Sequence, residues 1–432
     1  MSEQQHRVLI VGGGGREHAL AWKVAASPRV ASVHVAPGNA GTAGEPGVHN
    51  VAIAADDIPA LLAFARDQTI TLTLVGPETP LAAGIVDRFA AAGLACFGPT
   101  QAAAQLEASK AFSKNFLARH EIPTAQYAVF ADYGQAAAYI RSQPLPLVIK
   151  ADGLAAGKGV FIAHSVAEAL TAARAMLEEQ RFGASGARIV VEAYLQGEEA
   201  SFIVLVDGEH VLPLASSQDH KAAHDGDRGP NTGGMGAYSP APVVTAAVIE
   251  RVMTSIIQPT VAGMAAEGRP LTGVLYAGLM IADGNPQVLE FNTRFGDPET
   301  QPLMLRLESD LVPLVEAALA GRLDRCEARW HKQAALGVVM AAAGYPDTCR
   351  KGDVITDAAS ASSTDVHVFH AGTSVAGDEI ITSGGRVLCV CALGDTVAAA
   401  ADQAYARAAG IHWPGAWYRR DIGHRAMHRE KI

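Results

Sequence analysis

The stretch Val288-Leu-Glu-Phe-Asn-Thr-Arg-Phe-Gly-Asp-Pro-Glu-Thr-Gln-Pro (288–302) says most about the fold and chemistry of this chain. Its first half is typical of a strand, in which successive side chains point to opposite faces of a sheet. We therefore expect Glu290, Asn292 and Arg294 to share one face. The other face is then expected to carry the residues between them, Leu289, Phe291 and Thr293.

This pattern suits the handling of a phosphoryl group. A carboxylate and an amide oxygen two residues apart, as in Glu290 and Asn292, are ligands that Mg²⁺ or Mn²⁺ accepts. Arg294 beside them can stabilise the negative charge of a phosphoryl group in transfer. Asp297 and Glu299 follow in a turn, where they could receive a cationic substrate amine. A polar face of an antiparallel sheet would explain the three strand residues equally well, but not the polar turn.

A glycine-rich loop, KADGLAAGKGV (150–160), lies further toward the N-terminus. It differs from a Walker A motif, which needs four residues between its glycines and Ser or Thr after the lysine. Here three residues separate Gly153 from Gly157, and Gly159 follows Lys158. A mobile loop with Lys158 at its tip and Lys150 at the preceding strand end would suit a triphosphate. A flexible surface turn with solvated lysines remains the alternative.

A second glycine loop, VLIVGGGGREH (8–18), follows a strand and opens a helix, where backbone amides can hold a phosphate. The dinucleotide fingerprint would need glycine at position 17, which is Glu17, and an acid near the end of the second strand, which reads Val35-Ala36-Pro37. A phosphate or phosphosugar loop is therefore favoured over NAD(P) binding. A turn that only packs the helix against the strand stays possible.

The first hundred residues alternate between strand and helix patterns, which predicts a doubly wound parallel sheet. The predicted strands are 7–11, 32–35, 72–75 and 95–97, and the predicted helices are 16–26, 58–67 and 81–92. Ligands of such sheets bind at the carboxyl ends of the strands. The loops found there are 12–15, 37–41 and 76–80.

Beyond residue 105 the pattern changes. A helix is predicted at 245–266, strands at 147–150, 188–192, 273–281 and 287–292, and short strands with a final helix after residue 322. The stretch 217–242 has almost no periodicity, and an irregular stretch of that length is usually functional or disordered. In VVEAYLQGEEAS (190–201), backbone could face an adenine and Glu198 or Glu199 a ribose. A solvated acidic turn is the simpler interpretation of that segment alone.

Composition excludes several classes of protein. The 432 residues suggest about three domains, and a net charge of −10 argues against broad attraction to nucleic acid or anionic membranes. No apolar run approaches the roughly 18 residues of a spanning helix, and the polar N-terminus shows no signal peptide. Cys389 and Cys391 favour buried reduced thiols over a metal or disulfide site, so we expect a cytoplasmic protein. His220 and His224 lack the glutamate of a zinc protease helix.

The order of these motifs resembles the ATP-grasp carboxylate–amine ligases. More closely, the chain resembles the family of glycinamide ribonucleotide synthetases, or phosphoribosylamine–glycine ligases. The matching stretches are GGGGREHAL (12–20), APGNAGTA (36–43), VGPETPL (75–81), FGPT (97–100), KADGLAAGKGV (150–160), SQDHK (217–221), GPNTGGMGAYSP (229–240), LYAGLM (275–280) and RFGDPETQ (294–301). Matches this long, in this order, exclude chance.

The resemblance implies a carbon–nitrogen ligase of purine biosynthesis. ATP would phosphorylate the carboxylate of glycine, and the amine of 5-phosphoribosylamine would then attack the glycyl phosphate. The catalytic residues implied are Arg294, Lys158, Asp219 and Lys221. The ATP-binding residues implied are Lys110, Lys150, Lys158, Gly157, Gly159, Glu192, Ala193, Leu195, Glu198 and Glu199. The substrate-binding residues implied are Gly14, Gly15, Gly38, Asn39, Pro77, Glu78, Asn231, Thr232, Gly233, Gly234, Met235, Asp297 and Glu299. Glu290 and Asn292 would hold the metal.

The implied architecture is α/β and α+β in three domains: a doubly wound parallel sheet (1–105), an ATP-grasp domain of two lobes (106–325, with a lid lobe about 124–195) and a small mostly-β domain (326–432). The partners implied are small-molecule substrates only, with no nucleic acid or membrane, and the chain is expected to act as a monomer. Two departures from the family pattern are Ala222, where an arginine is usual, and the absence of an acid in the strand Tyr276–Leu279.

Two other enzymes remain in competition. A nicotinamide-linked oxidoreductase is motivated by the N-terminal strand–helix–strand unit. Another ATP-grasp ligase, one that formylates or carboxylates a purine precursor, would share the nucleotide motifs and differ in its acceptor pair. A non-catalytic nucleotide-binding homologue is disfavoured by the intact Lys150, Glu290, Asn292 and Arg294.

Overall fold

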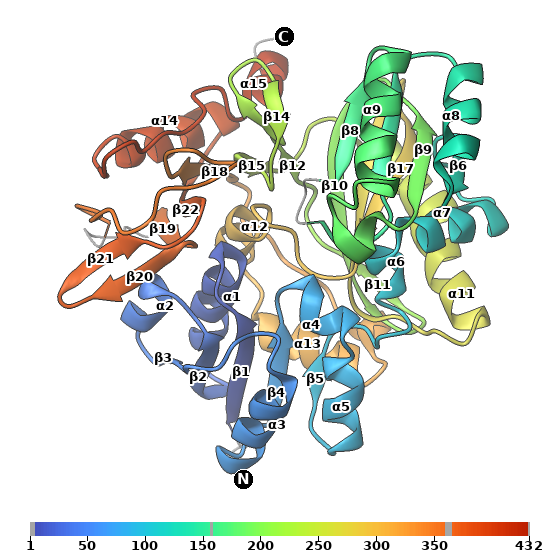
Figure 1. Ribbon diagram of the computed structural model, residues 1–432. Coiled ribbons are helices and arrows are strands. Elements are labelled where there is room, and N and C mark those ends of the chain that lie inside the picture. The colour runs from blue at the N-terminus through green and yellow to red at the C-terminus, as the bar shows by residue number, and fades with distance from the viewer. Residues whose placement is uncertain (1–4, 156–158, 359–364, 431–432) are drawn as a thin grey trace.

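The computed structural model describes residues 5–155, 159–358 and 365–430, and it divides into regions that surround a central helix, α12 (Thr300–Arg306). In Figure 1 the N-terminal region lies below this helix, the central region lies to the upper right and the C-terminal region lies to the upper left. No helix within the described ranges combines the length and the apolar character that crossing a membrane requires.

The N-terminal region is a parallel sheet with strand order β3-β2-β1-β4-β5, which confirms the predicted doubly wound fold. Its strands are β1 (His6–Gly12), β2 (Val30–Pro37), β3 (Val48–Asn50), β4 (Leu72–Val75) and β5 (Cys96–Phe97). Its helices are α1 (Gly15–Ala25), α2 (Ala40–Gly44), α3 (Ile58–Asp67), α4 (Glu78–Ala82) and α5 (Ile85–Ala91). Strand β3 and helix α2 were not predicted because they are too short to show a period, with three and five residues. The single predicted helix 81–92 is wrong, because Gly84 (φ +83°) takes a left-handed conformation that separates α4 from α5.

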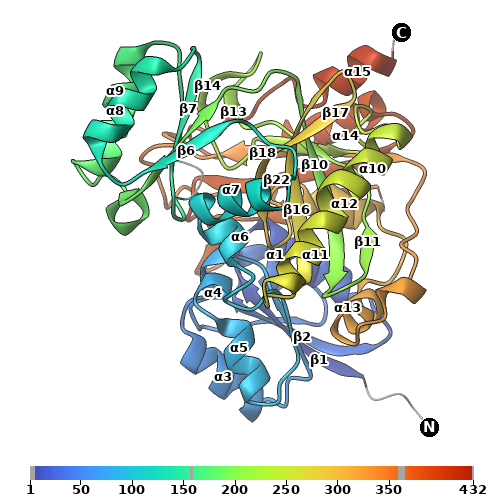
Figure 2. The same cartoon turned by 90° about the vertical axis from the view of Figure 1, so that its right-hand side faces the viewer.

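The central region contains two antiparallel sheets. The first, of order β6-β9-β7-β8, consists of β6 (Tyr127–Phe130), β7 (Leu147–Ala151), β8 (Val160–Ala163) and β9 (Ile189–Ala193). Helices α8 (Tyr133–Ser142) and α9 (Val166–Leu177) lie on the outer side of this sheet (Figure 2). The second sheet, of order β11-β10-β16-β17, consists of β10 (Glu198–Asp207), β11 (Val211–Pro213), β16 (Thr272–Ala282) and β17 (Asn285–Asn292). These are the two lobes expected of an ATP-grasp fold.

Four further helices pack around the second sheet. They are α6 (Gln105–Ala108), α7 (Lys110–Arg119), α10 (Ala246–Val252) and α11 (Gln258–Ala266). A π-helical turn (Met253–Ile257) joins α10 to α11, so the helix predicted over 245–266 is almost continuous. Helix α13 (Leu311–Leu319) and the 3₁₀ turns Gly183–Gly186 and Leu323–Arg325 complete this part of the chain.

Strand β17 departs from strict alternation. Its register against β16 shifts between Gly278 and Leu279, where Gly278 pairs with Glu290 and Leu279 pairs with Val288. Leu289 is the extra residue of this β-bulge, and it lines the same cavity as Glu290. Val288 and Phe291 are buried in the core, and Phe291 also reaches the cavity wall. Glu290, Asn292 and Arg294, predicted to share one face, all line the larger cavity, and so do Leu289 and Phe291.

The stretch without periodicity is structured after all. It forms β12 (Gln218–Asp219), β13 (Ala222–His224), β14 (Arg228–Asn231) and β15 (Gly236–Ser239). These strands are too short to show a hydrophobic period, and β15 is stabilised by pairing with β18 (Ala334–Ala341), about a hundred residues away. No local signal in the sequence reports such a partner.

The C-terminal region is built on the sheet β12-β15-β18-β22-β19, with β19 (Val366–His370) and β22 (Arg386–Gly394). The hairpin β20 (Thr373–Ala376) and β21 (Glu379–Thr382) and the helices α14 (Val397–Ala408) and α15 (His424–Glu430) complete it. Cys389 and Cys391 lie side by side on β22, both buried and free, as predicted. This region is mostly β, and its strands β18 and β22 pack against α12 at the centre of the molecule (Figure 1).

Candidate active site

Two adjoining cavities lie between the sheets of the central region. The larger has a volume of about 370 Å³ and the smaller about 190 Å³, together a size that suits a nucleotide and a small substrate. They share Lys150, Glu192, Lys221 and Glu290 in their walls. A ligand extending through both would therefore pass these charged groups.

The smaller cavity has a largely apolar wall. Its lining includes Val148, Ile162, Ala193, Tyr194, Leu195, Leu279 and Met280. Ala193 and Leu195, expected at an adenosine, thus lie where a flat aromatic ring could be enclosed. Glu199 also lines this cavity, whereas Glu198 forms an ion pair with Arg429 of α15 at 2.7 Å and does not line it. Of the two acids that sequence left open for the ribose, Glu199 is the one at the cavity.

A buried group of lysines lies where the cavities meet. The Glu192 carboxylate forms ion pairs with Lys114 Nζ at 2.9 Å and with Lys150 Nζ at 3.0 Å, and all three side chains are buried. Burial lowers the pKa of Lys114 to about 8, although Glu192 acts against this shift. Glu192 itself, expected beside an adenosine, is therefore occupied by the two lysines. Lys110 Nζ donates to the Gly153 carbonyl at 3.2 Å and faces the larger cavity.

Two residues of the glycine loop that were expected to bind ATP, Gly157 and Lys158, lie outside the described residues. Gly159, which follows them, lines the larger cavity. A Cβ at Gly159 would lie 2.8 Å from the Ala155 side chain, so this end of the loop folds closely onto itself.

Glu290 is the most suitable metal ligand in the cavity. Within the described ranges its carboxylate has no hydrogen-bond or ion-pair partner. Burial would raise the pKa of Glu290, but the nearby charges of Lys221, Lys150, Lys110 and Arg294 lower it, so the group is ionised. Asn292 accepts a hydrogen bond from Arg294 Nη2 at 3.2 Å through Oδ1, which leaves one lone pair for a cation. This pair of oxygen donors fits Mg²⁺ or Mn²⁺.

Arg294 is held in place by two carboxylates. Its guanidinium lies 3.0 Å from Glu107 and 3.5 Å from Glu78, and these contacts keep its pKa above its ordinary value in spite of burial. Glu107 is buried and also accepts from the Thr293 backbone amide at 2.7 Å. Burial raises the pKa of Glu107, while Arg294 opposes that shift.

Asp219, the last residue of β12, and Lys221, two residues later, form a second charged group. Lys221 Nζ lies 2.8 Å from Asp219 and 3.0 Å from Glu199. Burial, with the nearby charges of Glu299 and Glu199, raises the pKa of Asp219 to about 6, while Lys221 acts in the opposite direction. Both residues line the larger cavity.

The turn after β17 is held by hydrogen bonds on both sides. Glu299 Oε1 accepts from Tyr276 Oη at 2.8 Å and from Ser201 Oγ at 3.0 Å. Asp297 accepts from Arg386 Nη2 at 2.9 Å and from Gln301 Nε2 at 2.7 Å. Asp297 and Glu299 both line the larger cavity, beside Thr232 and Gly233. Asn231 lines the smaller cavity.

The N-terminal glycine loop does not line the cavity as expected. Gly14, Gly15, Gly38 and Asn39 are absent from its described wall, which instead contains Arg16, Pro77 and Glu78. The Gly14 amide donates to Glu17 Oε2 at 2.6 Å, so a carboxylate already occupies the place where this amide could hold a phosphate. Asn39 caps α2 and donates to the His370 carbonyl at 2.8 Å. Gly234 and Met235 also lie outside the wall, and Met235 is buried in the C-terminal core.

Several cavity residues were missed from sequence. They are Arg16, Glu107, Lys114, Tyr276 and Arg386. Arg16 lies in the motif GGGGREHAL (12–20), and Lys114 lies one helical turn after Lys110. Both residues could therefore have been predicted from their positions in the sequence. Arg386 lies about ninety residues beyond the turn that it contacts, and nothing in its neighbourhood marks it.

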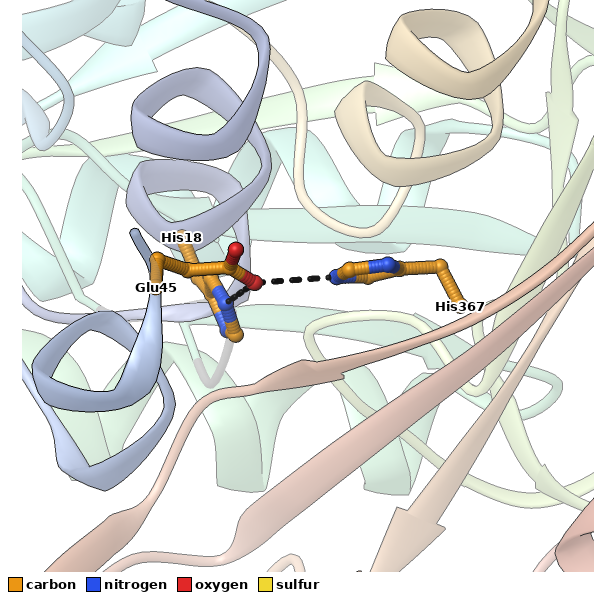
Figure 3. A group of neighbouring side chains, drawn as sticks. All are labelled: His18, Glu45 and His367. Carbon is orange, nitrogen blue, oxygen red and sulfur yellow. Dashed lines mark hydrogen bonds and ion pairs between the residues drawn. The ribbon is translucent and has the colours of Figure 1, made fainter. Parts of the chain in front are cut away.

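A separate polar cluster joins the N-terminal and C-terminal regions outside the cavity. Glu45 Oε1 lies 3.0 Å from His18 Nε2 and 3.2 Å from His367 Nε2 (Figure 3). Two imidazoles and a carboxylate could suggest a metal centre. However, His18 Nδ1 accepts the backbone amide of His370 at 2.7 Å, so in the neutral ring the proton is on Nε2. That nitrogen donates to Glu45 and has no lone pair for a cation, which makes this cluster a hydrogen-bonded tie between regions.

Comparison with known proteins gives one consistent result. The family models described as phosphoribosylglycinamide synthetase N domain, ATP-grasp (A) domain and C domain match residues 6–107, 108–300 and 335–425. The chain is 63% identical over 426 residues to a phosphoribosylamine–glycine ligase of Allochromatium vinosum, covering 98% of this chain and 100% of that protein. It is 61% identical over 427 residues to the ligase of the same name from Escherichia coli strain K12, covering 98% and 100%.

Solved structures agree. The crystal structure of a phosphoribosylamine–glycine ligase from Thermotoga maritima superposes with a TM-score of 0.85 at 33% identity, covering 96% of this chain and 100% of that one. A biotin carboxylase of Campylobacter jejuni superposes with a TM-score of 0.73 at 13% identity, covering 96% and 93%. The second likeness is one of fold alone.

Proposed function

Because this chain belongs to the phosphoribosylglycinamide synthetase family, we propose that its two adjoining cavities are the nucleotide and substrate sites of a phosphoribosylamine–glycine ligase. The enzyme joins glycine to 5-phosphoribosylamine with hydrolysis of ATP, giving glycinamide ribonucleotide, ADP and phosphate in purine biosynthesis. Its reaction runs through glycyl phosphate, in keeping with the family.

The smaller cavity is proposed to take the adenosine. Its apolar wall suits a purine ring, and Glu199 suits the ribose hydroxyls. The triphosphate would then extend past Lys150 into the larger cavity, toward Lys110. The family resemblance adds Lys158 to these phosphate-binding residues. Lys110, Lys114, Lys150 and Lys221 already line the larger cavity, so positive charge is in place to neutralise the phosphates.

Glu290 and Asn292 are proposed to hold Mg²⁺ or Mn²⁺. The observation that supports this assignment most strongly is that the half-buried Glu290 carboxylate lines both cavities and has no protein partner among the described residues. When bound there, the ion would neutralise charge on the phosphates. Arg294, fixed by Glu107 and Glu78, is proposed to stabilise the phosphoryl group as it moves to the glycine carboxylate.

The acceptor half of the reaction is assigned to the part of the larger cavity that the smaller one does not share. Its wall includes Arg16, Pro77, Glu78, Asp297 and Arg386. Here the amine of phosphoribosylamine would attack the carbonyl carbon of glycyl phosphate, the carbon–nitrogen bond would form and phosphate would leave. Asp297 and Glu299 would orient the attacking amine of phosphoribosylamine, and Asp219 with Lys221 would stand at the junction with the nucleotide.

The finer points of organisation are proposals as well. We propose action as a monomer on small molecules, without nucleic acid or membrane, and the net charge of −10 supports the last two points. The five cysteines are free, which supports a reducing compartment such as the cytoplasm. We divide the chain at about residues 105 and 325, with a lid lobe over about 124–195, since separate hydrophobic clusters fill the lid lobe and the N-terminal sheet.

Titration with MgATP tests the metal assignment. We expect Glu290→Gln to weaken binding of MgATP by about 10- to 100-fold while binding of ATP with excess chelator changes little. The exposed residue Glu209 gives a matched control, because Glu209→Gln removes the same charge far from the cleft. Equal affinity of Glu290→Gln and the wild type for MgATP would refute the assignment.

A further inference from the structure

The C-terminal region contributes one side chain to the larger cavity. Among the described residues that line it, Arg386 alone comes from beyond residue 300. It stands at the first position of β22, and its side chain reaches away from that strand to the turn that follows β17. A charged side chain directed from one region into the site of another calls for a physical reason.

The guanidinium of Arg386 joins two segments of the acceptor site. Nη1 donates to the Gly233 carbonyl at 2.5 Å and to the Asp297 carbonyl at 2.7 Å. Nη2 donates to the Asp297 carboxylate at 2.9 Å. The Asp297 charge raises the pKa of Arg386, which therefore stays charged despite burial. The planar fork of arginine can make these contacts at once, which the single ammonium of lysine cannot.

The Gly233 peptide is held from its other side as well. Its amide donates to the Tyr345 hydroxyl at 3.1 Å, so both polar atoms of Gly233 bond to the C-terminal region. The packing here leaves no room for larger residues. A Cβ at Gly233 would lie 3.0 Å from Arg386 Cζ, and one at Gly234 (φ +108°) would lie 2.4 Å from Pro298. The glycine pair thus lets the loop lie directly on the guanidinium and on the turn after β17.

These contacts lead to a loop and a turn that form one wall of the acceptor site. We propose that Arg386 is a positioning residue for the acceptor half of the reaction, which fixes Asp297 and the Gly233 loop where phosphoribosylamine binds. Tyr345 supports it through the Gly233 amide. The inference rests on the proposed function, because it takes the acceptor to bind beside Asp297. It also gives the C-terminal region a role in the reaction.

The test separates the acceptor from the nucleotide. In Arg386→Lys and Arg386→Met we expect the KM for phosphoribosylamine to rise about 10- to 100-fold, since a displacement of about 1 Å at a reacting group has effects of that size. The KM for ATP should stay within about twofold. Tyr345→Phe should act in the same direction and more weakly. Arg350, on the surface of the same region and paired with Asp353 at 2.7 Å, gives the control Arg350→Met.

A second readout addresses the first half-reaction. Glycine-dependent scrambling of ¹⁸O between the β,γ-bridge and the β-nonbridge positions of ATP reports glycyl phosphate formation without the acceptor. It should persist in the Arg386 variants at close to the wild-type rate. An unchanged KM for phosphoribosylamine, or an equal loss of scrambling and acceptor use in both variants, would overturn the proposal. Wild-type protein that consumes no phosphoribosylamine would instead contradict the proposed function.

Discussion

Replacing Glu192 by glutamine leaves two buried lysines without the carboxylate that they share. Glu192 lies on β9 with 2% of its side chain exposed, 2.9 Å from Lys114 and 3.0 Å from Lys150. Glutamine has nearly the same shape, so the substitution changes charge with little change in packing. The lobe containing β7 and β9 should therefore lose stability for an electrostatic reason alone.

The expected loss is about 3 kcal/mol. At an effective dielectric constant near 20, each of the two ion pairs has a Coulomb energy of about 5 kcal/mol, most of which compensates for burial of the charges. Removing one partner of a buried pair typically costs about 3–5 kcal/mol. We expect the lower end, because the pKa of Lys114 is already about 8 and this lysine can lose its proton near neutral pH.

Hydrogen exchange measures this loss locally. Amides of β9 pair with β7 and exchange only when the lobe opens, so a loss of about 3 kcal/mol accelerates their exchange roughly 100-fold. Amides of the N-terminal sheet should be unaffected. The exposed Glu179 gives the control Glu179→Gln, which should leave exchange in β9 unchanged. If amide exchange in β9 accelerates by less than about threefold in Glu192→Gln, the Glu192 ion pairs do not stabilise this lobe.

Three further predictions concern other parts of the molecule. Arg294→Lys should lower kcat about 100- to 1,000-fold in steady-state assays with the KM for ATP nearly unchanged, and a fall below tenfold would contradict its role. His370 is buried and its pKa is lowered to about 3 by burial, so the folded state binds fewer protons than the unfolded state below pH 6.5 and stability falls as pH falls. Between pH 6.5 and 5, the free energy of unfolding of His370→Phe, measured with denaturant, should therefore fall by about 2 kcal/mol less than that of the wild type. The free energy of unfolding of the exposed variant His412→Phe should change as in the wild type. Gly76→Ala should destabilise the N-terminal sheet by about 1–3 kcal/mol in thermal or denaturant unfolding, because its Cβ would lie 1.9 Å from Glu17 Oε1, and an unchanged midpoint would show that Glu17 can move away.

The features predicted correctly from sequence are those that repeat locally. Strands β1, β2 and β4 of the parallel sheet show short apolar runs followed by glycine, and β17 carries alternating polar residues. Periods of two and of 3.6 residues are properties of neighbouring residues, so they can be recognised without knowledge of the fold.

Other features depend on contacts between distant segments. The short strand β15 exists because it pairs with β18, and Leu289 faces the cavity because of a bulge against β16. The separation of α4 from α5 results from one left-handed glycine, Gly84. A single glycine within a helical pattern does not by itself predict that the helix is broken there.

The same distinction holds for the candidate site. Glu290, Asn292 and Arg294 could be grouped because one strand carries them. Glu192 was expected beside an adenosine, but its partners Lys114 and Lys150 come from other elements and decide its environment. The Gly14 amide was expected to face a phosphate, yet Glu17 one turn later accepts its hydrogen bond. In each case another side chain of the protein bonds to the group that was expected to bind a ligand.

Dependence of ADP release on each substrate tests most directly whether the chain acts as a phosphoribosylamine–glycine ligase. ADP release should be followed with ATP, glycine, phosphoribosylamine and Mg²⁺, and then with each component omitted in turn. We expect sustained ADP release to need both glycine and phosphoribosylamine and to yield glycinamide ribonucleotide in equal amount. Sustained ADP release with formate or bicarbonate in place of glycine, or without phosphoribosylamine, would contradict it.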